Sequence, residues 1–295
     1  MNDHQRWLDA VVRNRDPLEP LPTSVAPRTA ALADIHAVVF DVYGTLLISG
    51  TGDVGSSDES DDGTAIRDAM EAAGLSSKTA PVPSIEQLHR EIRRSNQERS
   101  SETCPKPEVD IFDIWRTTLI AAGLTSLAEQ TDRVVMLAAQ YESRANPTWP
   151  MPGAMESLEI LASSGLPLGI VSNAQAFTLP LVHDLVGGPV EEHGFDLDLC
   201  IYSFRYRQAK PAPRLFDALR GGLRRRGISP HQTLYVGNDK LNDIWAAAQA
   251  GMRTAWFAGD RRSCRPRHDD PRCASLEPDL VLTELRQLPS CLGIK

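Results

Sequence analysis

Six short apolar runs, separated by helical patterns, constrain the fold of this chain more than any other feature. They lie at residues 36–40, 166–171, 199–203, 233–236, 254–257 and 280–282. Such runs are typical of strands that are buried on both faces, as in a parallel sheet. Helical patterns at 153–163, 213–227 and 243–250 alternate with them. Alternating strands and helices form βαβ units, so the sequence predicts an α/β fold built on a parallel sheet.

A block of consecutive helical patterns interrupts this alternation after the first strand. The patterns lie at 64–73, 84–98, 109–122 and 126–141. We therefore expect a core formed by residues 36–48 and 150–295, with a helical cap inserted at 49–149. The cap includes an acidic, Gly/Ser-rich connecting loop. Residues 1–35 begin with a short amphipathic helix and continue as a proline-rich stretch, which we expect to form an N-terminal arm packed on the core.

Composition excludes several classes of protein. Lys and Arg number 31 against 39 Asp and Glu, giving a formal charge of −8, so nucleic acid is not an expected partner. The chain lacks the run of about 18 apolar residues that a membrane-spanning helix needs and the apolar stretch of a secretory signal. Five scattered cysteines without a CxxC motif indicate the reducing cytoplasm. Cys264, His268 and Cys273 do not have the spacing of a zinc site.

Polar side chains follow four of the predicted strands. Ligands bind beyond the carboxyl ends of the strands in an open α/β sheet, so these residues are candidates for one site. A carboxylate and a tight turn follow the first strand, a hydroxyl and an amide the second, a cation the third, and two carboxylates the fourth. The candidates are Asp41, Tyr43, Gly44, Thr45, Ser172, Asn173, Lys210, Asp239 and Asp243.

The order of these motifs resembles that of the haloacid dehalogenase (HAD) superfamily of hydrolases, over most of residues 35–290. The motifs are DxxGT at 41–45, Ser-Asn at 172–173, Lys-Pro at 210–211 and G-x-D-x3-D at 237–243. The resemblance implies a Rossmann-like core with a helical cap that closes over a small anionic substrate.

The same resemblance implies covalent catalysis. Asp41 would be the nucleophile, forming an aspartyl ester or acyl phosphate that water hydrolyses. Ser172 and Asn173 would bind oxygens of the transferred group, and Lys210 would offset their charge. Asp239 and Asp243, together with Asp41 and the backbone carbonyl of Tyr43, would hold Mg²⁺.

Two residues depart from the phosphatase pattern. Phosphatases of this family usually carry an Asp acid and base where this chain has Tyr43, and a phenol is a poor base at neutral pH. The DxYGT form resembles L-2-haloacid dehalogenases, whose halide leaves without a proton. Asn238 stands where the family often has Asp, which leaves open whether Asn238 or Asp239 is the direct metal ligand.

The charges of the candidates favour a metal. Asp41, Asp239 and Asp243 give −3 and Lys210 gives +1, so the site would carry −2, which a divalent cation would neutralise. The sequence therefore predicts Mg²⁺-dependent hydrolysis of a small organic phosphate. Metal-independent 2-haloacid dehalogenation is the alternative that Tyr43 supports. A third alternative is a non-catalytic binding or regulatory protein on the same core. The oligomeric state is not predicted.

Overall fold

A six-stranded parallel sheet forms the centre of the molecule. The computed structural model describes residues 9–51, 63–75 and 81–294. The strand order is β5-β4-β1-β6-β7-β8, and every neighbouring pair is parallel. The strands are β1 (Ala37–Phe40), β4 (Leu168–Ser172), β5 (Phe195–Tyr202), β6 (Thr233–Gly237), β7 (Arg253–Phe257) and β8 (Leu280–Leu282). The predicted α/β class is confirmed.

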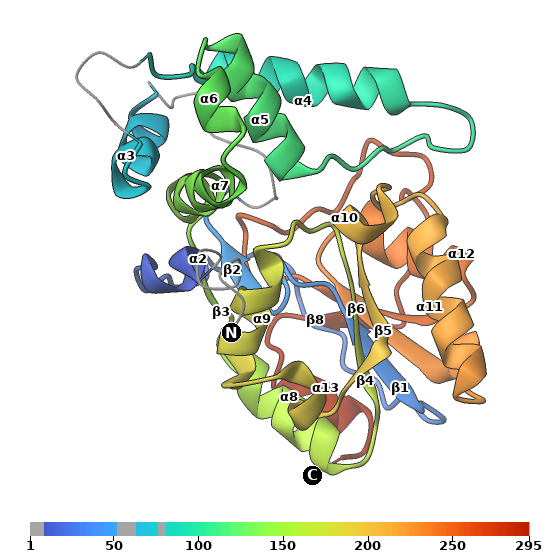
Figure 1. The fold of residues 1–295 in the computed structure, drawn as a ribbon. Coiled ribbons are helices and arrows are strands. Elements are labelled where there is room, and N and C mark those ends of the chain that lie inside the picture. Colours follow the sequence, from blue (N-terminus) through green and yellow to red (C-terminus); the bar gives the residue numbers. More distant parts are fainter. Residues whose placement is uncertain (1–8, 52–62, 76–80, 295) are drawn as a thin grey trace.

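Helices cover both faces of this sheet (Figure 1). Successive side chains of a strand point to opposite faces. Accordingly, Val38 and Phe40 pack with α8 (Ala154–Ser163), α9 (Thr178–Val186) and α13 (Gln287–Cys291). Ala37 and Val39 pack instead with α11 (Arg214–Arg225) and α12 (Ala246–Gln249). Three shorter helices connect these elements: η1 (Val190–His193), α10 (Ser203–Tyr206) and η2 (Pro230–Gln232).

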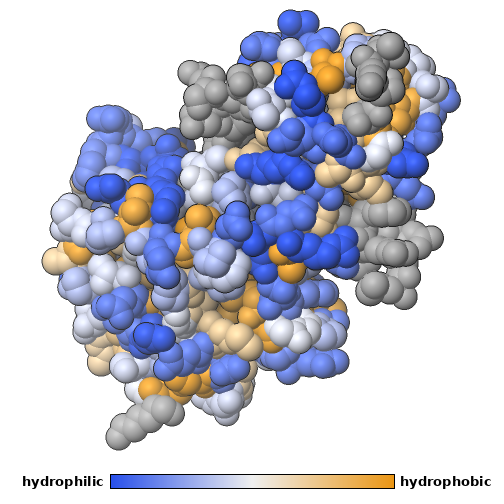
Figure 2. Space-filling model, turned by 90° about the vertical axis from the view of Figure 1, so that its left-hand side faces the viewer, coloured by the Kyte–Doolittle hydropathy of each residue, from blue (hydrophilic) through white to orange (hydrophobic). Residues whose placement is uncertain are grey.

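Five further helices form a block at one end of the molecule, with a hydrophobic core of its own around the fully buried Trp115. They are α3 (Thr64–Ala72), α4 (Ile85–Arg99), α5 (Ile111–Ala121), α6 (Thr125–Ala128) and α7 (Thr131–Ala145). The chain enters the block through β2 (Leu47–Ser49) and leaves it through β3 (Thr148–Pro150), which pair antiparallel. Figure 2 shows the block as a smaller lobe above the α/β lobe.

Several elements differ from the sequence-based expectation. The single helix predicted at 126–141 is two helices, because the backbone leaves the helical region at Gln130. The helix predicted at 243–250 begins earlier, as a π-helix at Lys240–Trp245 that continues into α12. The prediction omitted α9 and the β2–β3 pair. Most of the acidic connecting loop lies outside the described residues.

The N-terminal arm runs along the α/β lobe. After α2 (Ala10–Arg13), the Leu21 N–H donates to Asp260 at 3.1 Å. Arg28 forms an antiparallel bridge with Val281 of β8, and the Leu32 N–H donates to the Cys291 carbonyl at 2.7 Å. These contacts place the arm against the loop after β7, β8 and the end of α13.

Two of the sequence-based predictions concern membrane-spanning helices and cysteines. Within these residues, no helix combines the length and apolar character needed to cross a membrane. All five cysteines lie in the described part of the chain and carry free thiols.

Candidate active site

The Lys210 ammonium lies between two carboxylates at the carboxyl edge of the sheet. Its Nζ is 2.8 Å from Oδ1 of Asp41 and 2.6 Å from Oδ1 of Asp243. It also donates to the Val171 carbonyl at 3.0 Å. Lys210 is 4% exposed and Asp41 8%. The contacts fix the cation directly against the predicted nucleophile.

The sheet order explains this meeting of distant residues. β1 lies between β4 and β6, so the loops that follow these strands share one edge of the sheet. Asp41 follows β1, while Asp243 lies in the π-helix after β6. Tyr235 of β6 supports them: its hydroxyl donates to the Val171 carbonyl at 2.7 Å and lies 3.1 Å from Asp243. Sequence reasoning missed Tyr235, whose only signal was a phenol within an apolar strand.

Burial and neighbouring charges both shift the pKa values of Lys210 and Asp243. Burial alone would lower the pKa of Lys210, but the Asp243 and Asp41 carboxylates outweigh it and raise that pKa to about 12. Burial raises the pKa of Asp243, Lys210 opposes this shift, and Asp41 and Asp239 add to it. The lysine is therefore held as a cation.

The turn after β1 is shaped by contacts with the fourth motif and with the loop after β7. Gly44 has a φ of +77°, and a Cβ there would lie 2.4 Å from Cβ of Ser263, so only glycine fits. The Thr45 hydroxyl donates to Oδ1 of Asn238 at 3.2 Å. This hydrogen bond ties the turn to the fourth motif.

The Tyr43 hydroxyl contacts helix α9. It lies 2.8 Å from the Thr178 hydroxyl of α9, and both residues are buried. Burial, followed by the nearby Glu142, raises the pKa of Tyr43 above its ordinary value. The hydroxyl is therefore engaged by Thr178, although Tyr43 is among the residues that line the cavity beside Asp41.

Ser172 and Asn173 occupy different positions at the end of β4. Asn173 lines the cavity beside Asp41, and its Oδ1 accepts from the Lys210 backbone N–H at 2.7 Å. The Ser172 hydroxyl is buried and donates to the Asn173 carbonyl at 3.3 Å. The structure therefore brings Asn173 to the cavity, while Ser172 supports the backbone behind it.

An arginine binds the carboxylate of Asp239. Arg267 donates from Nε at 3.1 Å to each carboxylate oxygen and from Nη2 at 2.5 Å to Oδ2. The same carboxylate accepts from the backbone N–H groups of Leu241 and Asn242, at 2.8 and 3.1 Å, and so caps the π-helix. Asp243 in turn accepts from the Asp239 N–H at 2.9 Å.

Arg267 belongs to a loop between β7 and β8 that lies alongside the fourth motif. Arg265 in this loop donates its N–H to the Asn238 carbonyl at 3.1 Å and accepts from the Lys240 N–H at 2.9 Å. Arg265 also lines the cavity beside Asp41. Sequence reasoning missed both arginines. The available signal was the concentration of arginine between residues 261 and 272.

These contacts do not fit the predicted Mg²⁺. Both oxygens of Asp239 and both oxygens of Asp243 accept hydrogen bonds from the protein. Within the described residues, no three His, Cys, Asp or Glu side chains are grouped to hold a metal. The charge count that predicted the ion omitted Arg265 and Arg267. With both included, three carboxylates face three cations, and the need for a divalent ion on grounds of charge disappears.

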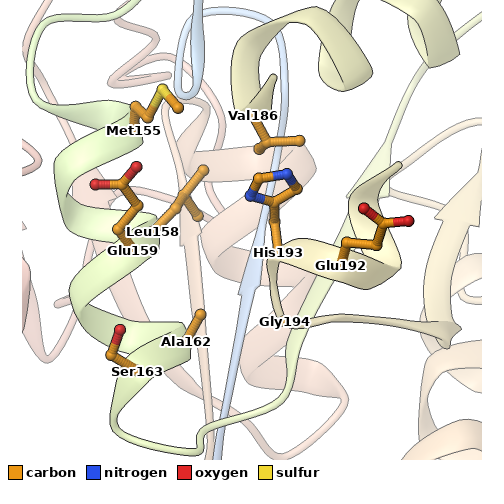
Figure 3. Close-up of a pocket in the computed structure, with 9 residues that line it drawn as sticks. All are labelled: Met155, Leu158, Glu159, Ala162, Ser163, Val186, Glu192, His193 and Gly194. Carbon is orange, nitrogen blue, oxygen red and sulfur yellow. The ribbon is translucent and has the colours of Figure 1, made fainter. Parts of the chain in front are cut away.

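Two cavities differ in size and in the residues that line them. The one beside Asp41 is small, about 30 Å³, and all nine residues that line it are polar: Asp41, Tyr43, Asn173, Lys210, Asn238, Asp239, Asn242, Asp243 and Arg265. A larger one, of about 330 Å³, lies between α8 and the segment 186–194 (Figure 3). None of the predicted site residues lines the larger cavity.

A segment of the helical block contacts the core next to Lys210. The Ala209 N–H donates to the Lys106 carbonyl at 2.8 Å. The Glu108 carboxylate accepts from the Ser203 hydroxyl at 2.6 Å and from the Gln175 amide at 3.0 Å. The cap and the core are therefore joined by polar contacts close to the site.

Comparisons with known proteins agree with this arrangement. The model of the haloacid dehalogenase-like hydrolase family matches residues 35–251. Phosphoglycolate phosphatase of Escherichia coli strain K12 is 30% identical over 236 residues, which cover 74% of this chain and 79% of that protein. Haloacid dehalogenase-like hydrolase domain-containing protein 3 of Xenopus laevis is 29% identical over 143 residues, covering 48% of this chain and 55% of that protein.

Solved structures share the fold. The crystal structure of a 2-haloacid dehalogenase from Pseudomonas syringae pv. Tomato DC3000 matches with a TM-score of 0.58 and 24% identity. The match covers 88% of this chain and 98% of the dehalogenase. At this identity, the likeness speaks for the architecture alone.

Proposed function

Because this chain belongs to the haloacid dehalogenase-like hydrolase family, we propose that it hydrolyses a small organic phosphate through a covalent intermediate on Asp41. The polar lining of the cavity beside Asp41 carries the proposal. A phosphoryl group presents several oxygens to bind, whereas a haloalkanoate presents an apolar carbon and a halide at the reacting end. The similarity to a phosphatase across 74% of the chain supports the same choice of substrate class.

In the proposed first step, a carboxylate oxygen of Asp41 attacks phosphorus. The bond between phosphorus and the ester oxygen breaks, and its electron pair leaves with the alcohol oxygen. Lys210, 2.8 Å from Asp41, and Arg265 at the cavity offset the charge of the transferring group. Water then attacks phosphorus, the bond to Asp41 breaks, and inorganic phosphate is released. No step is assigned to Mg²⁺, because the ligands described above do not fit it.

The position of Tyr43 adds a prediction about substrates. With its hydroxyl held by Thr178, the leaving oxygen takes its proton from solvent. Turnover should therefore fall steeply as the leaving alcohol becomes less acidic. Rates for a series of aryl phosphates with leaving-group pKa values from about 7 to 10 would measure this dependence. A flat series would indicate a general acid that the geometry has not revealed.

The same observation favours a second candidate, hydrolytic dehalogenation of a 2-haloacid. Asp41 would attack the carbon bearing the halogen, halide would leave without a proton, and water would hydrolyse the ester. Lys210 and Arg265, the two cations that line the cavity, would suit its carboxylate. The predicted cytoplasmic location is compatible with either activity.

The deciding assay follows 4-nitrophenyl phosphate hydrolysis with Mg²⁺ and with a chelator, beside halide release from 2-chloropropionate. We expect phosphate turnover, and a loss of about a thousandfold or more in Asp41→Asn, which lacks the nucleophile. The exposed Asp269→Asn serves as the matched control. Halide release without phosphate release would replace the first candidate with the second.

A further inference from the structure

We propose that the Arg267 guanidinium takes the place of a divalent cation beside Asp239, so that the site works without a bound metal ion. The consequence for catalysis rests on the proposed phosphate hydrolysis. The placement of Arg267 stands on its own contacts and can be tested separately.

The pairing of Arg267 with Asp239 is two-pronged and partly buried. Nε and Nη2 of Arg267 both reach the carboxylate, and the Asp239 side chain is 9% exposed. A guanidinium matches the two oxygens of a carboxylate with parallel donors, which makes such pairs strong and directional. Mg²⁺ demands near-octahedral oxygen ligands. To use Asp239, the ion would first have to displace the arginine.

The loop that carries Arg267 is fixed to the fourth motif by its backbone. Arg265 pairs with Asn238 and Lys240 on either side of Asp239. The Asn238 amide also donates to the Ser263 carbonyl at 2.6 Å. Arg267 itself has a φ of 53°, a left-handed conformation that is costly for a residue with a Cβ. These contacts hold the guanidinium against Asp239 as part of the fold.

The charges of the site are consistent with a built-in cation. Lys210 pairs with both Asp41 and Asp243 from one side and offsets one of their two negative charges. Arg267 neutralises Asp239 from the other, and Arg265 lines the cavity as a third positive group. Arg267 is a positioning residue, because it acts through Asp239 and is not among the residues that line the cavity.

Metal binding provides a readout that does not depend on turnover. Mn²⁺, as a probe for Mg²⁺, is titrated into the wild type, Arg267→Gln and Arg272→Gln, and bound ion is measured by electron paramagnetic resonance. Arg272 lies in the same loop but pairs with Asp270, so its variant controls for loss of an arginine. In the wild type and the control, we expect only weak Mn²⁺ binding that does not depend on Asp239. In Arg267→Gln, we expect Mn²⁺ to bind about ten- to a hundredfold more tightly than in the wild type.

Two further variants complete the test. Adding Asp239→Asn to Arg267→Gln should abolish the gained binding. Arg267→Lys keeps the charge but loses the fork, so its affinity should lie between those of the wild type and Arg267→Gln. If Arg267→Gln does not fold by circular dichroism, Arg267→Lys and the comparison of wild type with Asp239→Asn decide the question.

The outcomes separate this inference from the proposed function. Tight Mn²⁺ binding by the wild type that Asp239→Asn removes would overturn it, as would an Arg267→Gln variant that folds and gains no binding. Wild-type phosphate turnover that survives the chelator supports it, and turnover that the chelator abolishes contradicts it. If no phosphate is hydrolysed under any condition, the proposed function fails while the Mn²⁺ titrations still decide the role of Arg267.

Discussion

At the level of single residues, the buried ammonium of Lys210 lies between the carboxylates of Asp41 and Asp243. Lys210→Met would leave the two carboxylates facing each other without a cation. We expect kcat/KM to fall by about 10²–10³-fold and the free energy of unfolding to fall by about 3–5 kcal/mol. Kinetics and urea unfolding measure both. Lys106→Met, at an exposed position, should change neither, and an active Lys210→Met would refute the assigned role.

Tyr43 allows a test that separates packing from chemistry. Tyr43→Phe removes the hydroxyl that contacts Thr178 and leaves the ring in place. We expect the free energy of unfolding to fall by about 1 kcal/mol. The change in kcat should be far below the roughly 10²–10⁴-fold that general acid–base catalysis contributes. The partly buried Tyr206→Phe is the control. A hundredfold loss of kcat in a fully stable Tyr43→Phe would restore the phenol to the chemistry.

The sequence allowed part of this site to be located residue by residue. Asp41, Lys210 and Asp243 were found because polar groups at the ends of buried strands must gather at one edge of a parallel sheet. Arg265 and Arg267 were missed because an Arg/Pro-rich loop has no periodicity that fixes where its side chains point. The sequence likened Tyr43 to the tyrosine of L-2-haloacid dehalogenases, but only the packing of α9 shows that its hydroxyl contacts Thr178.

Among the elements, prediction succeeded where burial imposes a pattern. Five of the six strands lie within two residues of their predicted positions, because their centres are short apolar runs. The exception is β5, which begins at Phe195 and not at residue 199, because Asp196 and Asp198 interrupt its apolar pattern. Helix α9 was missed because its sequence, TLPLVHDLV, is apolar on most sides and includes Pro180 in its first turn. The β2–β3 pair is three residues long on each side, too short for alternation to be visible. The π-helix depends on tertiary contacts of Asp239 and Asp243, which spacing alone does not specify.

Helix α7 carries a carboxyl group that should make stability depend on pH. Burial raises the pKa of Glu142 to about 7, above its ordinary 4.5. The folded chain therefore binds this proton more tightly than the unfolded chain, and stability is lost as pH rises from about 4.5 to 7. Glu142→Gln retains an acceptor for Asn146, which donates to Glu142 at 3.1 Å, and removes the charge.

We expect Glu142→Gln to be more stable than the wild type by about 1–3 kcal/mol at pH 8. The gain should shrink towards zero below pH 4.5, where Glu142 of the wild type is protonated in both the folded and the unfolded state. Urea unfolding across this range measures the difference. The exposed Glu129→Gln, just before α7, should show no such trend. A gain that is independent of pH would point to a cause other than the titration of Glu142.

For the molecule as a whole, one buried amide joins the two lobes. Gln175 of the core donates to the Glu108 carboxylate and the Val109 carbonyl, and it accepts from the Ile111 N–H at 3.2 Å. Gln175→Ala should lower the free energy of unfolding by about 1–3 kcal/mol, because it leaves buried polar groups without this partner. Hydrogen exchange should accelerate at the Ile111 amide.

The exposed Gln97→Ala on α4 provides the comparison for Gln175→Ala. It removes a glutamine from the cap without touching the junction, so exchange at Ile111 should stay at the wild-type rate. Equal acceleration in both variants would mean that the cap loosens for reasons other than the contacts of Gln175.

The docking of the arm on the core also has a consequence for the order of folding during synthesis. Leu21 and the Asp260 carboxylate that receives its N–H are 239 residues apart, and the β8 partner of Arg28 is translated later still. At about 5–20 residues per second, the ribosome needs roughly 10–50 s between the two. Prolines within the arm lack the N–H groups that would let it pair elsewhere in the meantime. The arm is thus translated long before the surface that receives it exists.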